Sequence, residues 1–226
     1  MSVFAENPWF ASLPPSDAQA LLAAARPLRL ATGEVLFLQG DPFNSVLDGF
    51  WGVVAGAIKV SILHPDGNEA ILSIVEPGNW FGEPALLHSS PRATTAVAHA
   101  DTELLVVGAD RFQSLMQRVS FANAIAALEA SRLQAALGLL ADIALQSTRT
   151  RVARRLVRLA YGDLTQSSQQ RAVIGISQDV IAMMLGVSRT TLSKELQALA
   201  KSGAISLHYG QIEIRDMAAL LASSES

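Results

Sequence analysis

The chain has 226 residues, of which 50% are apolar and 16% are charged, and it contains no cysteine. This length favours one large domain or two small ones, with enough apolar residues for a sizeable core. The absence of cysteine excludes disulfides, thiolate zinc sites and cysteine-ligated iron–sulfur clusters. No apolar run approaches the roughly 20 residues of a membrane span, and no basic-then-apolar segment opens the chain. We therefore expect a cytoplasmic protein without a membrane partner.

The net charge of −3 is unevenly distributed along the chain. Up to Ser147 there are 7 Lys and Arg residues against 14 Asp and Glu, whereas after it there are 10 against 6. The first part is therefore acidic and the second part basic. This asymmetry predicts an acidic partner, such as nucleic acid, for the C-terminal part alone.

The N-terminal half combines a short helical segment with a long β region. Residues 8–25 predict one or two short helices. From Leu28 to Val107, short apolar runs alternate with turn signals such as Gly40-Asp41-Pro42 and Pro77-Gly78-Asn79. The regular spacing predicts roughly eight strands in an antiparallel barrel or roll that could hold one small ligand.

One stretch of this β region, Phe81 to Ala98, reads FGEPALLHSSPRATTAVA and carries candidate binding residues. Gly82 permits a close backbone approach, and Pro84 suits the start of a short helix whose N–H groups would attract an anion. Arg92 offers a donor fork suited to phosphate, while Glu83 can accept hydrogen bonds from sugar hydroxyls. A sugar phosphate would fit this set, but a surface ion pair between Glu83 and Arg92 explains it equally well.

The segment from Phe121 to Leu145 predicts a long helix rich in Ala and Leu. Apolar residues recur on it at heptad-like spacing, with Glu129 as a charged interruption: Ala122, Ala126, Leu133, Ala136, Leu140 and Ile143. Such a stripe is best buried against a second copy of itself, which predicts a two-fold parallel dimer. The basic run that follows, residues 147–158, predicts another helix, whose arginines we expect mostly on a solvated face.

The stretch from Ile176 to Gln197 predicts two short helices joined by a tight turn. Ser177 can cap the first helix, Gly186 can end it in a left-handed conformation, and Ser188 can cap the second. Three leucines of the second helix face inward, Leu192, Leu196 and Leu199, which leaves outside Arg189, Thr190, Ser193 and Lys194. This pattern favours a DNA-binding helix-turn-helix over a solvated helix hairpin.

The chain after this stretch predicts a β-hairpin. Residues 205–214, turning near Tyr209-Gly210, are typical of the wing of a winged helix. We expect the tail from Ser223 onward to be frayed.

The pattern FGE-x-AL-x(5)-PRA-x-T resembles the phosphate-binding cassette of cyclic-nucleotide-binding domains. It is matched at Phe81, Gly82, Glu83, Ala85, Leu86, Pro91, Arg92, Ala93 and Thr95. Together with the helix-turn-helix, it makes the chain from Leu13 to Arg215 similar to bacterial regulators of the cAMP receptor protein/FNR family. The resemblance implies an α+β fold: a jelly-roll-like antiparallel β-roll over residues 1–118, a dimerisation helix over residues 119–146, and a winged helix-turn-helix over residues 147–226.

The resemblance also implies roles for the cassette residues. Glu83 would hold the ribose 2′-hydroxyl and Arg92 the cyclic phosphate, Gly82 would shape the turn, and the N–H groups of Ala85 and Ala93 would face the phosphate. Thr94 completes the candidate effector-binding set. We expect no obligatory cofactor, only an effector such as cAMP or another cyclic nucleotide.

The long helix departs from the family pattern at the positions that would contact the adenine base. The hydroxyl pair that the cAMP receptor protein offers to the base falls near Ala136 and Leu137 here, and neither can donate a hydrogen bond. The nearest polar residues are Ser131 and Gln134. The resulting ranking is a cyclic nucleotide first, another anionic effector second, and no small ligand third.

For DNA, the resemblance assigns Arg189, Thr190 and Lys194 to the family's three recognition positions. Ser177 and Gln178 lie where phosphate contacts occur, and the predicted set also includes Ser188 and Thr191. The implied partners are a two-fold symmetric DNA operator, a second copy of the chain, and RNA polymerase. Effector binding would act allosterically on the placement of the two recognition helices.

Two other classes fit the sequence less well. A heme sensor would need axial ligands, but the four histidines are scattered: His64, His88, His99 and His208. A phosphodiester-hydrolysing enzyme could be imagined around Glu83, His88 and Arg92, but no metal cluster or nucleophile–base spacing supports it. We therefore expect a regulator and not an enzyme.

Overall fold

The computed structural model describes residues 3–44, 48–163 and 170–225. Its contacts divide the chain into two compact units, Met1–Arg132 and Leu133–Ser226. The division falls inside the long helix α5 (Val119–Leu145). The three-part division inferred from the sequence stays a prediction.

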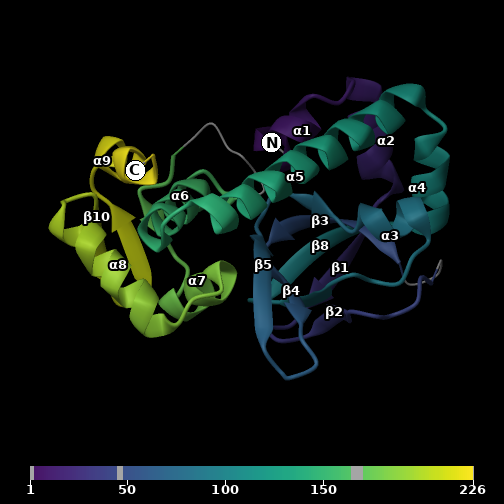
Figure 1. Cartoon of the computed structure of the whole chain (residues 1–226). Helices are drawn as coiled ribbons and strands as arrows, with labels where there is room; N and C mark the ends of the chain where they lie inside the picture. The colour runs from purple at the N-terminus through teal and green to yellow at the C-terminus, as the bar shows by residue number, and fades with distance from the viewer. Residues whose placement is uncertain (1–2, 45–47, 164–169, 226) are drawn as a thin grey trace. The chain divides into compact units, whose positions relative to one another are not determined.

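The first unit is an antiparallel β-roll that carries short helices (Figure 1). One four-stranded sheet has the order β1-β8-β3-β6 and the other has the order β2-β7-β4-β5. Their strands are β1 (Arg26–Leu30), β2 (Val35–Phe37), β3 (Gly49–Ala55), β4 (Ile58–Leu63), β5 (Glu69–Val75), β6 (Trp80–Phe81), β7 (Thr95–Ala98) and β8 (Thr102–Gly108). These eight strands confirm the predicted β-roll.

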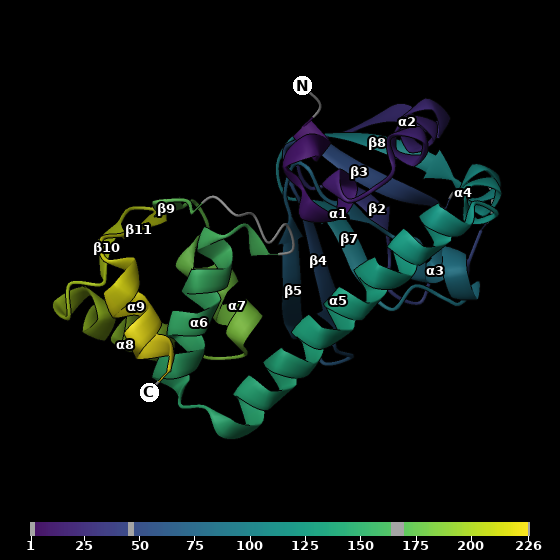
Figure 2. The same cartoon turned by 90° about the horizontal axis from the view of Figure 1, so that it is seen from above.

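The helices of the first unit lie before, within and after the strands (Figure 2). They are η1 (Val3–Glu6), α1 (Pro8–Ala11), α2 (Pro15–Ala24), α3 (Glu83–His88), α4 (Ala109–Met116) and the first part of α5. The predicted N-terminal helices are therefore present. The short cassette helix α3 begins one residue before Pro84.

An aromatic core joins these helices to the roll. The rings of Phe50 and Trp80 lie 5.0 Å apart, and Phe50 also meets the edge of Phe112 on α4. Phe112 in turn packs 6.1 Å from Phe121 of α5. Because large aromatic side chains remove much apolar surface from water, this chain of rings fixes the first turns of α5 on the roll.

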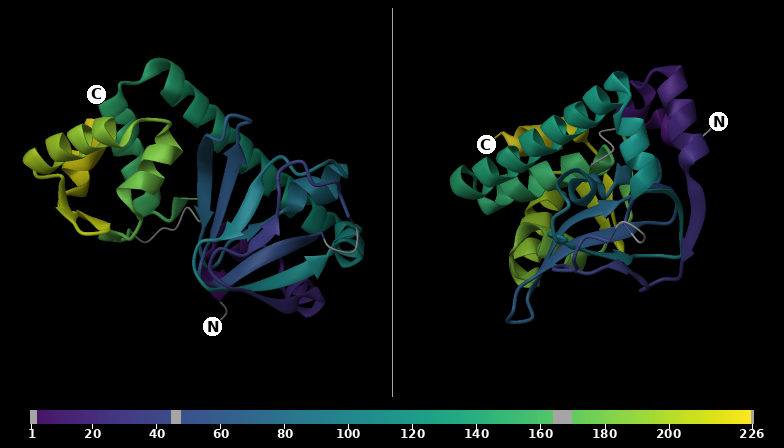
Figure 3. Two further views of the ribbon diagram at one scale, coloured as in Figure 1. Left: turned by 90° about the horizontal axis from the view of Figure 1, so that it is seen from below. Right: turned by 90° about the vertical axis from the view of Figure 1, so that its right-hand side faces the viewer.

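The second unit contains the rest of α5 and a winged helix-turn-helix. Its further elements are α6 (Thr148–Ala160), β9 (Val173–Ile174), α7 (Gln178–Leu185), α8 (Arg189–Lys201), β10 (Ile205–His208), β11 (Gln211–Ile214) and α9 (Met217–Ser224). The β10–β11 hairpin packs beside α8 (Figure 3). It confirms the predicted wing, with Tyr209 fully exposed at its turn.

The tail was expected to be frayed from Ser223 onward, which was wrong for Ser223 and Ser224, while Ser226 lies outside the described residues. Residues 217–224 form helix α9, whose first turn is capped by the Asp216 side chain, which accepts from the Ala219 N–H. Leu220 is buried, and the Ser224 carbonyl accepts a hydrogen bond from Arg154 at 2.7 Å. The tail is therefore held by packing against α6, a long-range contact that local sequence does not reveal.

The expectation that no segment resembles a membrane span also needs correction. Helix α5 is long enough and apolar enough to cross a membrane, judged by length and composition alone. Its apolar residues are interrupted by scattered polar ones, so no uninterrupted run marks it in the sequence. An apolar helix that pairs with another helix has the same composition.

Candidate effector site and nucleic-acid interface

The second position of the cassette, Gly82, can be occupied only by glycine. Gly82 lies between β6 and α3 in the left-handed region, at φ +98°. A Cβ atom added there would lie 2.3 Å from Cε3 of the buried Trp51 ring and 2.8 Å from the Gly49 carbonyl oxygen. Gly82 thus brings the start of α3 close against strand β3, as the sequence predicted.

Glu83 and Arg92 do not form the surface pair that was the alternative interpretation. Glu83 is fully buried and Arg92 is 5% exposed. Arg92 forms an ion pair with Asp48, and Glu83 forms one with Arg132 of α5. The two cassette residues are nevertheless neighbours, because the Arg92 Nη1 donates to the Gly82 carbonyl at 3.3 Å.

The remaining cassette residues differ in exposure. Ala85 is buried within α3, whereas Ala93 is exposed and Thr94 is partly exposed. The backbone of Arg92 is fixed on both sides, since its N–H donates to Asp41 and its carbonyl accepts from Gly40, each at 2.8 Å. The Gly40-Asp41 turn therefore positions the cassette arginine.

Arg132 is a cationic residue of this site that sequence reasoning missed. Besides the ion pair with Glu83, its Nη2 donates to the Trp80 carbonyl at 2.6 Å. Burial lowers the pKa of the Arg132 guanidinium to about 10, so this side chain still carries its charge at neutral pH. A charged residue on an otherwise apolar helix was the signal that could have revealed it.

The described parts of α5 supply no hydroxyl pair at the expected base position. Ser131 donates to the Leu128 carbonyl of its own helix at 2.8 Å, and Gln134 is exposed. Ala136 and Leu137 are exposed as well. The departure at the base position stays a prediction.

The helix-turn-helix has the caps that the sequence predicted. Ser177 accepts from the Val180 N–H at 3.3 Å, Gly186 ends α7 at φ +63°, and Ser188 accepts from the Thr191 N–H at 3.1 Å. These local bonds set where α7 ends and α8 begins.

Helix α8 buries one face and exposes the other. Leu192, Leu196 and Leu199 are at most 1% exposed. Arg189, Thr190 and Lys194 are exposed, and the Arg189 side chain retains 72% of its accessible surface. Its ion pair with Asp179, at 3.3 Å, is at the surface and therefore weak. Among the other predicted DNA residues, Gln178 and Thr191 are partly exposed, and Ser177 and Ser188 are exposed.

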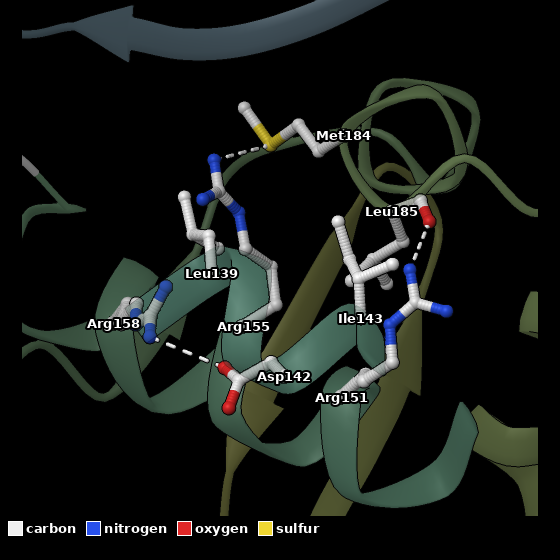
Figure 4. Close-up of a pocket in the computed structure, with 8 residues that line it drawn as sticks. All are labelled: Leu139, Asp142, Ile143, Arg151, Arg155, Arg158, Met184 and Leu185. Carbon is white, nitrogen blue, oxygen red and sulfur yellow. Dashed lines mark hydrogen bonds and ion pairs between the residues drawn. The ribbon is translucent and has the colours of Figure 1, made fainter. Parts of the chain in front are cut away.

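The arginines of α6 are mostly structural, contrary to the expected solvated face. Asp142 of α5 accepts from Arg154. It also accepts from Arg158 at 3.2 Å (Figure 4). Arg155 is 4% exposed and pairs with Asp163. Asp142, Arg155 and Arg158 line a small cavity of about 30 Å³, and they join α5, α6 and α7 within the second unit.

Comparison with known proteins agrees with this geometry. Residues 27–119 match the cyclic nucleotide-binding domain, and residues 150–223 match the Crp-like helix-turn-helix domain. The cyclic AMP receptor protein of Thermus thermophilus is 32% identical over 215 residues, which cover 95% of each chain.

The chain belongs to the cAMP receptor protein/FNR family of transcription regulators.

Other members of the cAMP receptor protein/FNR family are similar over nearly the whole chain. The CRP-like cAMP-activated global transcriptional regulator of Mycobacterium tuberculosis is 28% identical over 209 residues, 92% of each chain. The structure of a putative cAMP-binding regulatory protein from Silicibacter pomeroyi has a TM-score of 0.67 and 26% identity, covering 99% of this chain and 97% of the other.

The histidines considered for heme ligation lie at separate places. His64 Nδ1 lies 2.9 Å from the Asp66 carboxylate, and His208 Nε2 lies 3.0 Å from Glu213. In residues 3–44, 48–163 and 170–225, no group of three or more His, Asp or Glu side chains is arranged to hold a metal ion.

Proposed function

We propose that the chain is a homodimeric regulator that binds a two-fold symmetric DNA operator under control of an anionic effector in the β-roll. The observation that carries this proposal is the start of α8. Arg189 projects into solvent there, while the leucines of the same helix are buried. A helix held in this way presents its first turns to a major groove.

The proposed DNA contacts follow from side-chain chemistry. Arg189 donates from its planar fork to the two acceptors of a guanine, and Lys194 contacts guanine or phosphate as a single point of charge. Thr190 presents its hydroxyl to the DNA beside these two residues. Ser177 and Gln178 contact phosphates, and the paired hydroxyls of Ser188 and Thr191, 2.8 Å apart, complete the surface at the helix start.

The dimer is proposed from the exposed apolar side of α5. Leu133, Leu137, Leu140 and Ile143 are each more than half exposed. They lie on one side of the helix, and such a stripe is best covered by a second copy. A parallel pair would present two recognition helices to half-sites one duplex turn apart, roughly 34 Å.

The effector is proposed from the cassette. The buried Arg92 and Glu83 are the groups that would meet a cyclic phosphate and a ribose hydroxyl, with Gly82, Ala85, Ala93 and Thr94 around them. A cyclic nucleotide such as cAMP is the first candidate, another anionic effector is the second, and operation without a small ligand is the third. No further cofactor is needed for binding of this kind.

The family supports the other assignments. Its members are transcription regulators, so we propose that this chain acts in the cytoplasm on DNA and RNA polymerase, with α5 pairing with its copy and not with a membrane. We propose no catalytic step, since the cassette matches a binding domain.

DNA binding is tested by selecting operators from a random duplex library and measuring their affinity by fluorescence anisotropy. Arg189→Ala should weaken specific binding by about 1 to 3 kcal/mol and relax the preference at one base of each half-site. Lys201→Ala is the matched control, because it removes a charge from the far end of the same helix. If both variants lose equal affinity, or if operator selectivity is unchanged in Arg189→Ala, the assignment fails.

The effector is tested by calorimetric titration of the full chain with cAMP and with cGMP. Binding that disappears in Arg92→Ala would support the cassette as the site. Binding that persists in this variant would place the nucleotide elsewhere.

A further inference from the structure

All three nitrogens of the Arg92 guanidinium already donate hydrogen bonds. Its Nε, at 3.1 Å, and its Nη2 both donate to one carboxylate oxygen of Asp48. Its Nη1 donates to the Gly82 carbonyl. The two donors that Asp48 takes form one side of the fork that would otherwise bind two oxygens of a phosphate.

Two aromatic rings also lie against the same guanidinium. Its central carbon lies 4.3 Å from the Phe37 ring centroid and 4.9 Å from that of Trp51. Both rings lie in the interior of the roll, where only 9% of Phe37 and 2% of Trp51 are exposed. A phosphate that binds the Nε and Nη2 edge of Arg92 in the bidentate manner would have to take the place of Asp48.

Asp48 is itself fixed in this position. Its second carboxylate oxygen accepts from the Asn44 N–H at 2.7 Å, and its own N–H donates to the Asn44 carbonyl at 2.7 Å. Asp48 is only 7% exposed. A buried carboxylate with this many partners stays where it is unless another anion takes its place.

We propose that Asp48 is an internal ligand of Arg92, which a phosphate-bearing effector must displace, and that Asp48 thereby determines the affinity and the kind of effector that the β-roll accepts. This inference rests on the proposed effector function of the cassette. A cyclic phosphodiester carries one negative charge, as the Asp48 carboxylate does. It therefore gains little electrostatic advantage over the ligand it replaces, and it must also release a buried carboxylate.

The expected consequence is weak binding by the natural chain and tighter binding once the internal carboxylate is neutralised. In calorimetric titration of the full chain with cAMP, Asp48→Asn should bind at least about tenfold tighter than the natural chain. Asp48→Glu keeps the charge and should bind as weakly as the natural chain. The double variant Asp48→Asn with Arg92→Gln should lose the gain.

A matched control removes a different carboxylate from the same β-roll. The Asp66 side chain accepts from the Asn68 N–H at 2.9 Å in the hairpin between β4 and β5, whereas the Asp48 side chain accepts from Arg92. Asp66→Asn should therefore leave cAMP affinity unchanged. Equal affinities in the natural chain and in Asp48→Asn would overturn the proposal, as would equal gains in Asp66→Asn and Asp48→Asn.

A second probe separates this inference from the choice of effector. Inorganic phosphate should raise the thermal midpoint of Asp48→Asn but not that of the natural chain or the double variant. If this occurs while no variant binds cAMP, the internal ligand stands and the cyclic-nucleotide function fails. If neither probe distinguishes Asp48→Asn from the natural chain, the internal ligand is rejected.

Removal of the carboxylate leaves Arg92 without a counter-charge, so Asp48→Asn could fail to fold. In that case the Arg92 Nε–H resonance is compared by NMR between the natural chain and Asp48→Glu. A change in its shift and in its solvent exchange is expected, because the bound carboxylate is repositioned. An unchanged resonance would refute the proposal.

Discussion

The carboxylate of Glu83 is paired with Arg132 of α5 and not with Arg92 of its own cassette. Arg132→Leu would leave the fully buried Glu83 without this counter-charge. We expect a loss of about 3 to 5 kcal/mol in the free energy of unfolding, measured in urea by circular dichroism. The double variant Arg132→Leu with Glu83→Gln should recover a large part of this loss. Equal losses in the single and double variants would contradict the role given to the pair.

Gly82 gives a prediction about steric fit at the cassette. Gly82→Ala should lower the free energy of unfolding by about 1 to 3 kcal/mol, because its Cβ would overlap the Trp51 ring. Gly67→Ala is the matched control, since Gly67 has a similar φ of +91° but nothing within 4 Å of the added Cβ. The difference between the two variants in urea unfolding measures the clash alone. Similar losses would show that only the backbone conformation matters.

Asp142 gives a prediction for the second unit. Its carboxylate accepts from two arginines of α6, whose side chains are about one third exposed. Asp142→Ala should cost about 1.5 to 3 kcal/mol of stability, the range for hydrogen bonds to charged groups. Asp179→Ala, which removes an exposed partner, should cost less than about 1 kcal/mol. The two are compared by thermal unfolding, and a result in the reverse order would argue against the Asp142 network.

The proposed dimer can be tested by substitution in the exposed apolar stripe of α5, which consists of Leu133, Leu137, Leu140 and Ile143. Leu140→Glu places a charge on the stripe and should convert the protein to a monomer, as read by analytical ultracentrifugation. Specific affinity for a two-fold operator should fall with it, because the second half-site contact is lost. Gln134→Glu adds the same charge beside the stripe and should leave the dimer intact. A dimer that survives Leu140→Glu would require a different interface.

Asp17 gives a prediction about pH. Hydrogen bonding from Ser120, and then from Arg118, lowers the pKa of this buried carboxyl below its ordinary value of 3.8. A lowered folded-state pKa contributes stability that is present above the unfolded value and is lost as the pH falls through the folded value. The first unit should therefore lose stability below about pH 4. Asp17→Asn should be less stable than the natural chain at neutral pH, and its free energy of unfolding should fall less steeply as the pH is lowered. If the free energies of unfolding of the two proteins, measured in urea at several acidic pH values, fall equally steeply with pH, this assignment is refuted.

The helix-turn-helix was predictable because its signals are local. Ser177, Gly186 and Ser188 each act on backbone groups a few residues away, so the caps of α7 and α8 can be inferred from spacing alone. The eight strands were predictable for a similar reason, since each turn is marked by its own residues. The prediction of fraying was wrong for Ser223 and Ser224 because α9 is held by contact with α6.

The charge pairs of the cassette could not be predicted in this way. Asp48 lies 44 residues before Arg92, and Arg132 reaches Glu83 from a helix that the sequence assigned to dimerisation alone. Motif matching identifies Glu83 and Arg92 but not the partners that neutralise them. Only the folded roll brings the four side chains together.

The two compact units also divide the aromatic residues by type. All three tryptophans, Trp9, Trp51 and Trp80, belong to Met1–Arg132, whereas both tyrosines, Tyr161 and Tyr209, belong to Leu133–Ser226. Indole emission therefore reports on the β-roll alone, and phenol absorbance on the winged half alone. The natural chain thus carries two separate optical reporters, which can reveal without any label whether the halves melt together or in succession.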